Sequence, residues 1–210
     1  MAPDRWEPPA RTGRIVCLLS GGIDSAALLY RLHRSGHDAV PLFIDYGQRA
    51  AAQELAAASG LCAGIGAGLE RIHVPGLSAI GNGLSDPGPH TSPVFHARNL
   101  ILLSIAASYA ASRSAAAVGI GAHCTPSFPD QGGAFIQRAE AAISASLGTR
   151  MRVFAPFCGL DKLEVARLAA DAGVPIGATY SCYMGGTEPC GSCPSCTDRR
   201  AALKVLVENI

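Results

Sequence analysis

The chain has 210 residues, of which 49% are hydrophobic and only 16% are charged, and its formal net charge is +1. A chain of this length can bury one sizeable core, and its composition excludes a disordered protein. Its near neutrality gives no strong attraction to nucleic acid or to a membrane surface. The most apolar stretch, residues 100–111, is too short to cross a bilayer, and no signal peptide is apparent. We therefore expect a globular cytoplasmic protein without a nucleic-acid or membrane partner.

The first predicted elements flank a glycine turn. An apolar run at residues 15–19 predicts a buried strand, and the Ala- and Leu-rich residues 26–32 predict a helix. The turn between them reads Ser20-Gly21-Gly22-Ile23-Asp24-Ser25, and we expect Asp24 or Ser25 to cap the helix. Glycines that permit close backbone approach, hydroxyl donors and the positive end of a helix together favour a pyrophosphate. The turn matches neither the Walker motif nor the dinucleotide-binding motif, and the alternative is an ordinary tight turn.

Strands and helices alternate through the rest of the chain. Further strands are predicted at residues 39–44, 71–74, 116–121 and 151–154, with Pro41 at a strand start or a bulge. Helices are predicted at residues 48–59, 97–112, 135–147, 161–172 and 197–209, of which the first closes at Gly60 and the fourth at Gly173. The helix at 97–112 is apolar nearly all round, so we expect it to be largely buried. Residues 79–93 and 123–133 contain several glycines and prolines and predict irregular loops.

This alternation predicts an α/β fold built on a doubly wound, parallel, five-stranded sheet. We divide the chain into a flexible leader at residues 1–13, an α/β domain at 14–178, and an appendage at 179–210 that ends in a helix. In such sheets ligands bind at the carboxyl ends of the strands, near the point where the strand order reverses. The glycine turn after the first strand, the residues after the second strand and those after the fourth strand should therefore share one rim.

Polar residues at two places on this rim are candidates for contacts with a nucleotide. Asp45, Tyr46 and Gln48 follow the second strand, where a base or ribose would pass, although a strand end with a helix cap explains them as well. Arg98 and Asn99 open the apolar helix, where they bind either ligand groups or a neighbouring side chain.

A second group of candidates follows the fourth and fifth strands. Lys162 begins a helix against the helix dipole and is one of only two lysines, which favours a contact with phosphate over a solvated surface position. His123 and Cys124 are adjacent in sequence, so we expect a site-lining histidine rather than a nucleophilic Cys–His pair. Phe128 and Asp130 stand in the same loop, where Asp130 is either a substrate-side carboxylate or a turn cap.

The cysteines divide into two sets. Four are scattered, at positions 17, 62, 124 and 158, which does not suit a disulfide-rich secreted domain and favours a reducing compartment. The other four have the spacing Cys-x7-Cys-x2-Cys-x2-Cys, at Cys182, Cys190, Cys193 and Cys196. Four thiolates can close a tetrahedral structural zinc site. An iron–sulfur cluster or disulfides are the alternatives.

The motifs taken together resemble those of the 7-cyano-7-deazaguanine synthases of queuosine and deazapurine biosynthesis. The resemblance covers about residues 14–200. It rests on the glycine turn, residues 45–48, 97–99, 128–130 and 161–164, and on Ser181-Cys182-Tyr183 followed by Cys190-Gly191-x-Cys193-x-x-Cys196. It implies an adenine nucleotide alpha hydrolase-like sheet with a zinc-binding appendage, and a homodimer.

The resemblance also implies a reaction. Family members use ATP to adenylate the carboxylate of 7-carboxy-7-deazaguanine, release pyrophosphate, and use ammonia to form first the amide and then the nitrile. The cofactors implied are ATP, Mg²⁺ and a structural Zn²⁺. We expect Asp24, Ser25 and Lys162 to be catalytic, and we expect the nucleotide to be bound by Ser20, Gly21, Gly22, Asp24, Ser25, Asp45, Tyr46, Gln48, Arg98 and Asn99.

The chain departs from the family pattern on the side that meets the acceptor. Gln131-Gly132 replaces the usual Cys-Arg, and His123 stands where the family usually has Asn. These departures leave open a variant that stops at the amide or activates another carboxylate. A tRNA-modifying ATP pyrophosphatase is a further alternative, against which the neutral charge argues. A zinc-ribbon binding module on an inactive nucleotide fold is the alternative outside the enzymes.

Overall fold

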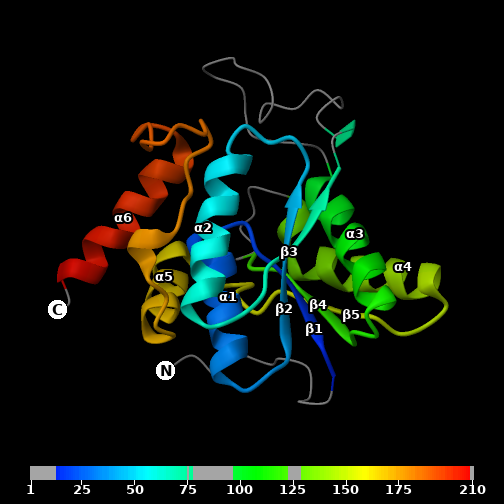
Figure 1. The fold of residues 1–210 in the computed structure, drawn as a ribbon. Coiled ribbons are helices and arrows are strands. Elements are labelled where there is room, and N and C mark those ends of the chain that lie inside the picture. The colour runs from blue at the N-terminus through cyan, green and yellow to red at the C-terminus, as the bar shows by residue number, and fades with distance from the viewer. Residues whose placement is uncertain (1–12, 75, 78–96, 123–128, 209–210) are drawn as a thin grey trace.

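Five parallel strands form the centre of the protein. A computed structural model (Figure 1) describes residues 13–74, 76, 77, 97–122 and 129–208. The strands are β1 (Ile15–Leu18), β2 (Ala39–Asp45), β3 (Glu70–His73), β4 (Ala117–Gly119) and β5 (Arg152–Phe154). They pair in parallel in the order β3-β2-β1-β4-β5. The predicted five-stranded doubly wound sheet is confirmed, and the strand order reverses between β1 and β4.

Helices cover both faces of the sheet (Figure 1). One layer holds α1 (Ile23–Arg34), α2 (Ala51–Gly64), α5 (Lys162–Asp171) and α6 (Pro194–Glu208), while α3 (Arg98–Ser112) and α4 (Gly133–Leu147) form the other. Two short 3₁₀ turns, η2 (Pro129–Gln131) and η3 (Ile176–Ala178), complete the described elements. Among the described residues, no helix combines the length and apolarity that crossing a bilayer requires.

The two cores follow from the alternation of side chains along the strands. Ile15, Cys17 and Leu19 face the layer that contains α1, whereas Val16 and Leu18 face α3 and α4. All five are buried, as expected for a parallel sheet covered on both faces. The strand is therefore apolar on both sides, which explains the continuous apolar run in the sequence.

Pro41 lies inside β2 without a bulge. It pairs with Cys17 of β1, while pairing with β3 starts only at Leu42. Proline cannot donate a ladder hydrogen bond. Its position one residue before the β3 pairing leaves it with a neighbouring strand on one side only, which explains how an inner strand accommodates it.

Three predicted helix boundaries are wrong. Helix α1 starts at Ile23, with Gly22 at the N-cap, so Asp24 and Ser25 lie in its first turn and neither caps it. Helix α2 continues through Gly60, because Leu61 and Cys62 beyond it are buried in the core. The chain turns only at Gly66, whose φ is +67°. Helix α6 starts at Pro194, the first helical position that proline favours.

The expected burial of α3 is only half right. Its buried residues are Asn99, Leu103, Ala106, Ala107 and Ala110, which fall on one face of the helix. Leu100 on another face is 37% exposed. Besides Leu100, the exposed residues of the helix are Ser104, Ser108, Ala111 and Ser112, so a largely apolar composition does not produce burial all round.

Candidate active site and metal centre

A cavity of about 460 Å³ opens at the carboxyl ends of the strands. Its walls come from the ends of β1, β2 and β4, the starts of α1, α2, α3, α5 and α6, the turn η2, and the segment before α6. This is the point at which the strand order reverses, where an open parallel sheet binds its ligand. The predicted common rim is therefore formed by the segments expected to share it, as far as these lie among the described residues.

Two serines hold the glycine turn in shape. The Ser25 hydroxyl accepts a hydrogen bond from the Ser20 backbone N–H at 3.2 Å and donates to the Gly22 carbonyl at 3.1 Å. The two hydroxyl oxygens lie 3.2 Å apart, and both serines line the cavity. This arrangement presents hydroxyl groups beside the N-terminus of α1, where an anion is favoured.

The turn needs glycine at Gly21 more than at Gly22. Gly21 has φ of +78°, and a β-carbon there would come within 2.6 Å of the Glu54 carbonyl oxygen in α2. Gly22 is extended, and a β-carbon there would meet nothing closer than 3.5 Å. Close packing of the turn against α2 therefore explains one glycine of the pair.

Gly121, which the sequence analysis did not single out, packs against the same turn from the other side. A β-carbon at this position would lie 2.7 Å from the carbonyl carbon and oxygen of Asp24 and 2.8 Å from the Ser25 nitrogen. The end of β4 thus touches the first turn of α1, backbone against backbone. A glycine just after a strand on the rim was the signal available for it.

Lys162 contacts the glycine turn although it lies 138 residues after Asp24 in the sequence. Its Nζ donates to both carboxylate oxygens of Asp24, at 2.7 and 2.6 Å, and both side chains line the cavity. Lys162 sits at the first position of α5 because Asp161 and Glu164 form a capping box: Glu164 N donates to Asp161 at 2.8 Å, and Asp161 N donates to Glu164 at 2.7 Å. The capped start of α5 therefore holds the Lys162 ammonium group beside the glycine turn.

Of the candidate residues after β2, Asp45 supports the strand end, whereas Tyr46 and Gln48 line the cavity. Asp45 lies off the cavity wall, where it accepts from Arg71 at 2.9 Å and from the Gly47 N–H at 3.2 Å, with His73 Nδ1 at 3.1 Å. Burial alone would raise its pKa, but the Arg71 hydrogen bond, the Gly47 N–H and the His73 charge outweigh burial, and the pKa is lowered. Asp45 thus holds the strand end and makes no contact with the cavity.

Tyr46 and Gln48, by contrast, do line the cavity. The Gln48 side-chain oxygen accepts from the Tyr46 backbone N–H at 2.9 Å, and Gln48 Nε2 donates to the Glu54 carboxylate at 2.9 Å. The turn after β2 is therefore rigid and carries its polar groups toward the ligand space.

The first turn of α3 meets η2 across the cavity. Asn99 donates to Asp130 twice: its backbone N–H reaches the carboxylate at 3.0 Å, and its side-chain amide reaches the Asp130 carbonyl at 2.9 Å. Arg98 lines the cavity and hydrogen-bonds to the Tyr46 hydroxyl. Asn99 and Asp130 also face the cavity, but they hold each other. His123, Cys124 and Phe128 lie outside the described residues.

Several cavity residues escaped the sequence analysis. Glu54 projects from the first turn of α2, and Tyr180, Ser181 and Tyr183 come from the segment before the cysteines. An acidic residue in the first turn of a helix that follows a rim strand was the available signal for Glu54. Ser181 and Tyr183 belong to the Ser181-Cys182-Tyr183 run and Tyr180 precedes it, and that run supported the family resemblance without being assigned to the cavity.

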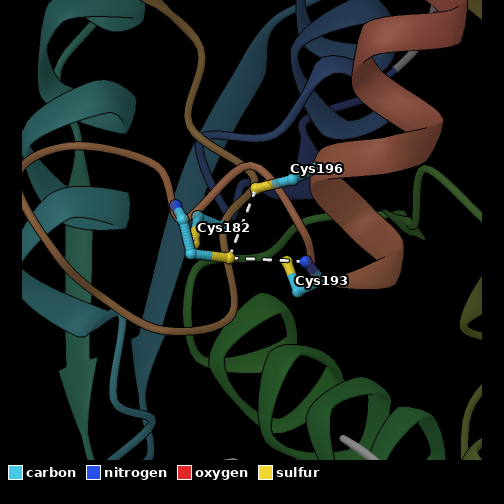
Figure 2. Close-up of side chains that lie close together, drawn as sticks. Cys182, Cys193 and Cys196 are labelled. Atoms are coloured by element: carbon cyan, nitrogen blue, oxygen red, sulfur yellow. Dashed lines mark hydrogen bonds between the residues drawn. The ribbon is translucent and has the colours of Figure 1, made fainter.

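The four clustered cysteines form one centre. The sulfur atoms of Cys182, Cys190, Cys193 and Cys196 lie within 4.8 Å of one another, and Figure 2 shows the three labelled side chains turned toward a common point. Backbone N–H groups donate to the sulfurs: Cys190 N reaches Cys182 at 3.3 Å, and Cys193 N reaches Cys190 at 3.4 Å. Hydrogen bonds from N–H groups stabilise thiolates, and the thiolate is the form in which cysteine binds a metal. The four residues are therefore suited to bind a single cation.

The spacing of the sulfurs separates the candidate metals. The four sulfurs lie within 4.8 Å of one another, a spacing close to that around a single zinc ion bound at about 2.3 Å. A cubane cluster places four irons between its cysteines and needs wider separation. The geometry therefore favours one ion over a cluster.

Backbone N–H groups of Ser192 and Cys193 lower the pKa of Cys190 to about 6, while burial raises that of Cys196 to about 12.

The chain before the cysteine centre contacts the glycine turn. Tyr180 N–H donates to the Gly21 carbonyl at 2.9 Å. Gly185, with φ of +71°, packs directly on the Arg49 backbone after β2. An ion at the cysteines would thus hold the cavity wall formed by residues 180–183 as well as the start of α6.

Comparison with known proteins agrees with this geometry. Residues 14–207 match the model of the family described as queuosine biosynthesis protein QueC. A 7-cyano-7-deazaguanine synthase of Aquifex aeolicus is 39% identical, covering 92% of this chain and 97% of that protein, and one from a Sulfurihydrogenibium species is 37% identical, covering 90% and 94%. Among solved structures, a 4-thiouridine synthetase in complex with RNA and bound ATP has the same fold, with a TM-score of 0.55, 18% identity, and coverage of 94% of this chain and 50% of that one.

Proposed function

Because the chain belongs to the QueC family of queuosine biosynthesis proteins, we propose that it is an ATP-dependent ligase that converts 7-carboxy-7-deazaguanine and ammonia into 7-cyano-7-deazaguanine. Its relatives of 37–39% identity are 7-cyano-7-deazaguanine synthases, so the chain is an enzyme of deazapurine biosynthesis. The proposal adds to this the activation of the carboxylate by ATP and the use of ammonia as the nitrogen donor.

The chemistry requires two activations. A carboxylate is a poor electrophile, so its oxygen attacks the α-phosphate of ATP, pyrophosphate leaves, and an acyl adenylate forms. Ammonia displaces AMP and gives the amide with loss of a proton. The amide oxygen is then adenylated by a second ATP, and elimination of AMP with a proton leaves the nitrile. Each activation places developing negative charge on pyrophosphate, which a catalyst must stabilise.

The contact between Lys162 and Asp24 carries the proposal. Asp24 lies in the first turn of α1, and Lys162 is held against it at 2.6 Å by the capped start of α5. Ser20 and Ser25 lie on the same cavity wall. When pyrophosphate occupies the turn, Lys162 would transfer its hydrogen bonds from the Asp24 carboxylate to phosphate oxygens, together with the serine hydroxyls and the N–H groups of the helix start.

Two metal ions belong to the proposal. The Asp24 carboxylate, once released by Lys162, is suited to Mg²⁺, which would neutralise phosphate charge. Zn²⁺ bound by the four cysteines would be structural, because four thiolates leave no open coordination position. In this proposal Asp24 would lie at the reacting phosphates, whereas the zinc centre would act through the wall that it supports.

The two lysines of the chain allow a matched test. Protein incubated with ATP, Mg²⁺, ammonia and 7-carboxy-7-deazaguanine should release AMP and pyrophosphate only when the acid is present. The variant Lys162→Ala should lose about 100- to 1,000-fold in kcat, the range for removing one transition-state donor. Lys204 is an exposed residue of α6, so Lys204→Ala should keep wild-type activity. Equal loss in both variants, or none in Lys162→Ala, would contradict the role of Lys162.

A further inference from the structure

The carboxylate of Glu54 on the cavity wall accepts one hydrogen bond and can accept more. It projects from the first turn of α2, and its Oε2 accepts from Gln48 Nε2 at 2.9 Å. Gln48 is itself held by the backbone N–H of Tyr46 at 2.9 Å. Within the described part of the chain no other hydrogen bond reaches the Glu54 carboxylate, so a fixed acceptor with spare capacity faces the ligand space.

The other acidic side chains of the cavity are engaged or exposed. Asp24 binds Lys162, and the Asp130 carboxylate accepts from the Asn99 backbone N–H. Asp198 lies on the solvent-exposed part of α6. Glu54 is therefore the acidic cavity residue best placed to bind a ligand that carries hydrogen-bond donors.

A cation stands beside this acceptor. Arg98 at the start of α3 lines the same cavity, and its charge acts on both Tyr46 and Glu54. Among the described residues no ion pair within 4.0 Å joins Arg98 to Glu54. An acceptor and a donor thus line the same cavity without being paired to each other.

We propose that Glu54 and Arg98 form the subsite that recognises the aminopyrimidinone edge of the deazaguanine substrate. This inference rests on the proposed function. The edge presents two adjacent N–H donors, from the ring nitrogen and the exocyclic amine, followed by a carbonyl acceptor. A carboxylate accepts from both donors, and a guanidinium donates to the carbonyl. The adenine of ATP presents one donor and one acceptor on its corresponding edge, so the subsite distinguishes the acceptor base from the nucleotide.

The electrostatics of Glu54 agree with this role. Burial raises its pKa, and the Gln48 hydrogen bond and the Arg98 charge offset that effect only in part. The charged carboxylate therefore lacks full compensation in the free cavity. Two donors from the base would supply it, because hydrogen bonds to a charged form favour that form.

The test changes the residue and the substrate edge together. AMP formation is measured with 7-carboxy-7-deazaguanine and with the analogue in which hydrogen replaces the exocyclic amine. For the wild type, the analogue should raise KM about 10- to 100-fold, because one carboxylate acceptor loses its donor. The variant Glu54→Gln should raise KM for the parent acid by a similar factor, leave KM for ATP within about threefold, and nearly abolish the difference between acid and analogue.

Two further variants make the outcome decisive. Arg98→Gln should raise KM for acid and analogue by the same factor, because it removes the donor to the ring carbonyl and leaves the amine contact intact. An undiminished analogue penalty in Glu54→Gln, or its loss in Asp130→Asn instead, would overturn the subsite alone. Absence of acid-dependent AMP formation by the wild type would overturn the proposed function and the subsite together.

Discussion

Replacing Gly121 with alanine should displace the glycine turn, because the new side chain would press on the backbone of α1. The new β-carbon would lie 2.7 Å from the Asp24 carbonyl carbon and oxygen and 2.8 Å from the Ser25 nitrogen. All three are backbone atoms of α1, so no flexible side chain can move aside to relieve the contact. The end of β4 and the first turn of α1 would have to separate by a few tenths of an ångström.

The size of the effect follows from this forced separation. Overpacking of a filled site costs about 1–3 kcal/mol. In a protein of 150–250 residues, each kcal/mol shifts Tm by about 2–4 °C, so Gly121→Ala should lower Tm by about 2–12 °C. The displaced turn carries Ser20 and Ser25, and misplacement of binding groups by a fraction of an ångström should raise KM for ATP about tenfold.

Thermal unfolding and an ATP titration of AMP formation measure both effects. Gly60→Ala is the matched control, because Gly60 is exposed inside α2 and a β-carbon there meets nothing within 4 Å. That change should raise stability by about 0.5–1 kcal/mol, since glycine weakens a helix interior. A Gly121→Ala protein that matches the wild type in Tm and in KM for ATP would refute the packing of β4 against the turn.

Three other predictions test the supports of the cavity. Asp45→Asn should destabilise the protein by about 1–2 kcal/mol at neutral pH, because the hydrogen bond from the half-exposed Arg71 loses its charged acceptor. The folded pKa of Asp45 is lowered, so this stabilisation is complete above its unfolded value of about 3.9 and is lost as pH falls through the folded value. Denaturant unfolding across that window should show wild type and variant converging. We expect elemental analysis to find one zinc ion per chain in the wild type, and Cys193→Ser should lose that ion and lower Tm. Asp161→Ala should cost about 1 kcal/mol by removing the capping box, and it should lower kcat/KM because Lys162 loses its fixed position.

Each of these three predictions has an outcome that would contradict it. A constant difference between wild type and Asp45→Asn from pH 7 to pH 2 would show that the charge on Asp45 is not what stabilises the strand end. Full zinc content in Cys193→Ser would remove that cysteine from the ligand set, and Cys62→Ala, in the core, should keep the ion. Unchanged kcat/KM in Asp161→Ala would separate the helix cap from the placement of Lys162.

The sequence was sufficient where local chemistry decides structure. The glycine turn, the strand before it and the cysteine spacing all act over a few residues, and each lies where expected. The common rim also followed, because parallel strands end at the same edge of a sheet. Asp24 and Lys162, 138 residues apart, both belong to segments that the topology brings to that edge.

The remaining features depend on packing that no local pattern encodes. Asp45 meets His73 because β2 and β3 pair in that register, and the sequence does not specify which residues of neighbouring strands lie opposite each other. Glu54 faces the cavity because of the rotation of α2 about its axis. That rotation is set by the burial of Ala58, Leu61 and Cys62 in the core that α2 shares with α1, and the helix pattern alone did not reveal it.

The identity of the product tests the central claim most directly. Wild-type protein is given ATP, Mg²⁺, 7-carboxy-7-deazaguanine and isotopically labelled ammonia, and the products are weighed by mass spectrometry. The account predicts a nitrile that carries one labelled nitrogen, with AMP and pyrophosphate as the nucleotide products. An amide that accumulates without conversion would restrict the activity to the first activation. Release of ADP in place of AMP, or an acid that remains unlabelled while ATP is consumed, would contradict the account.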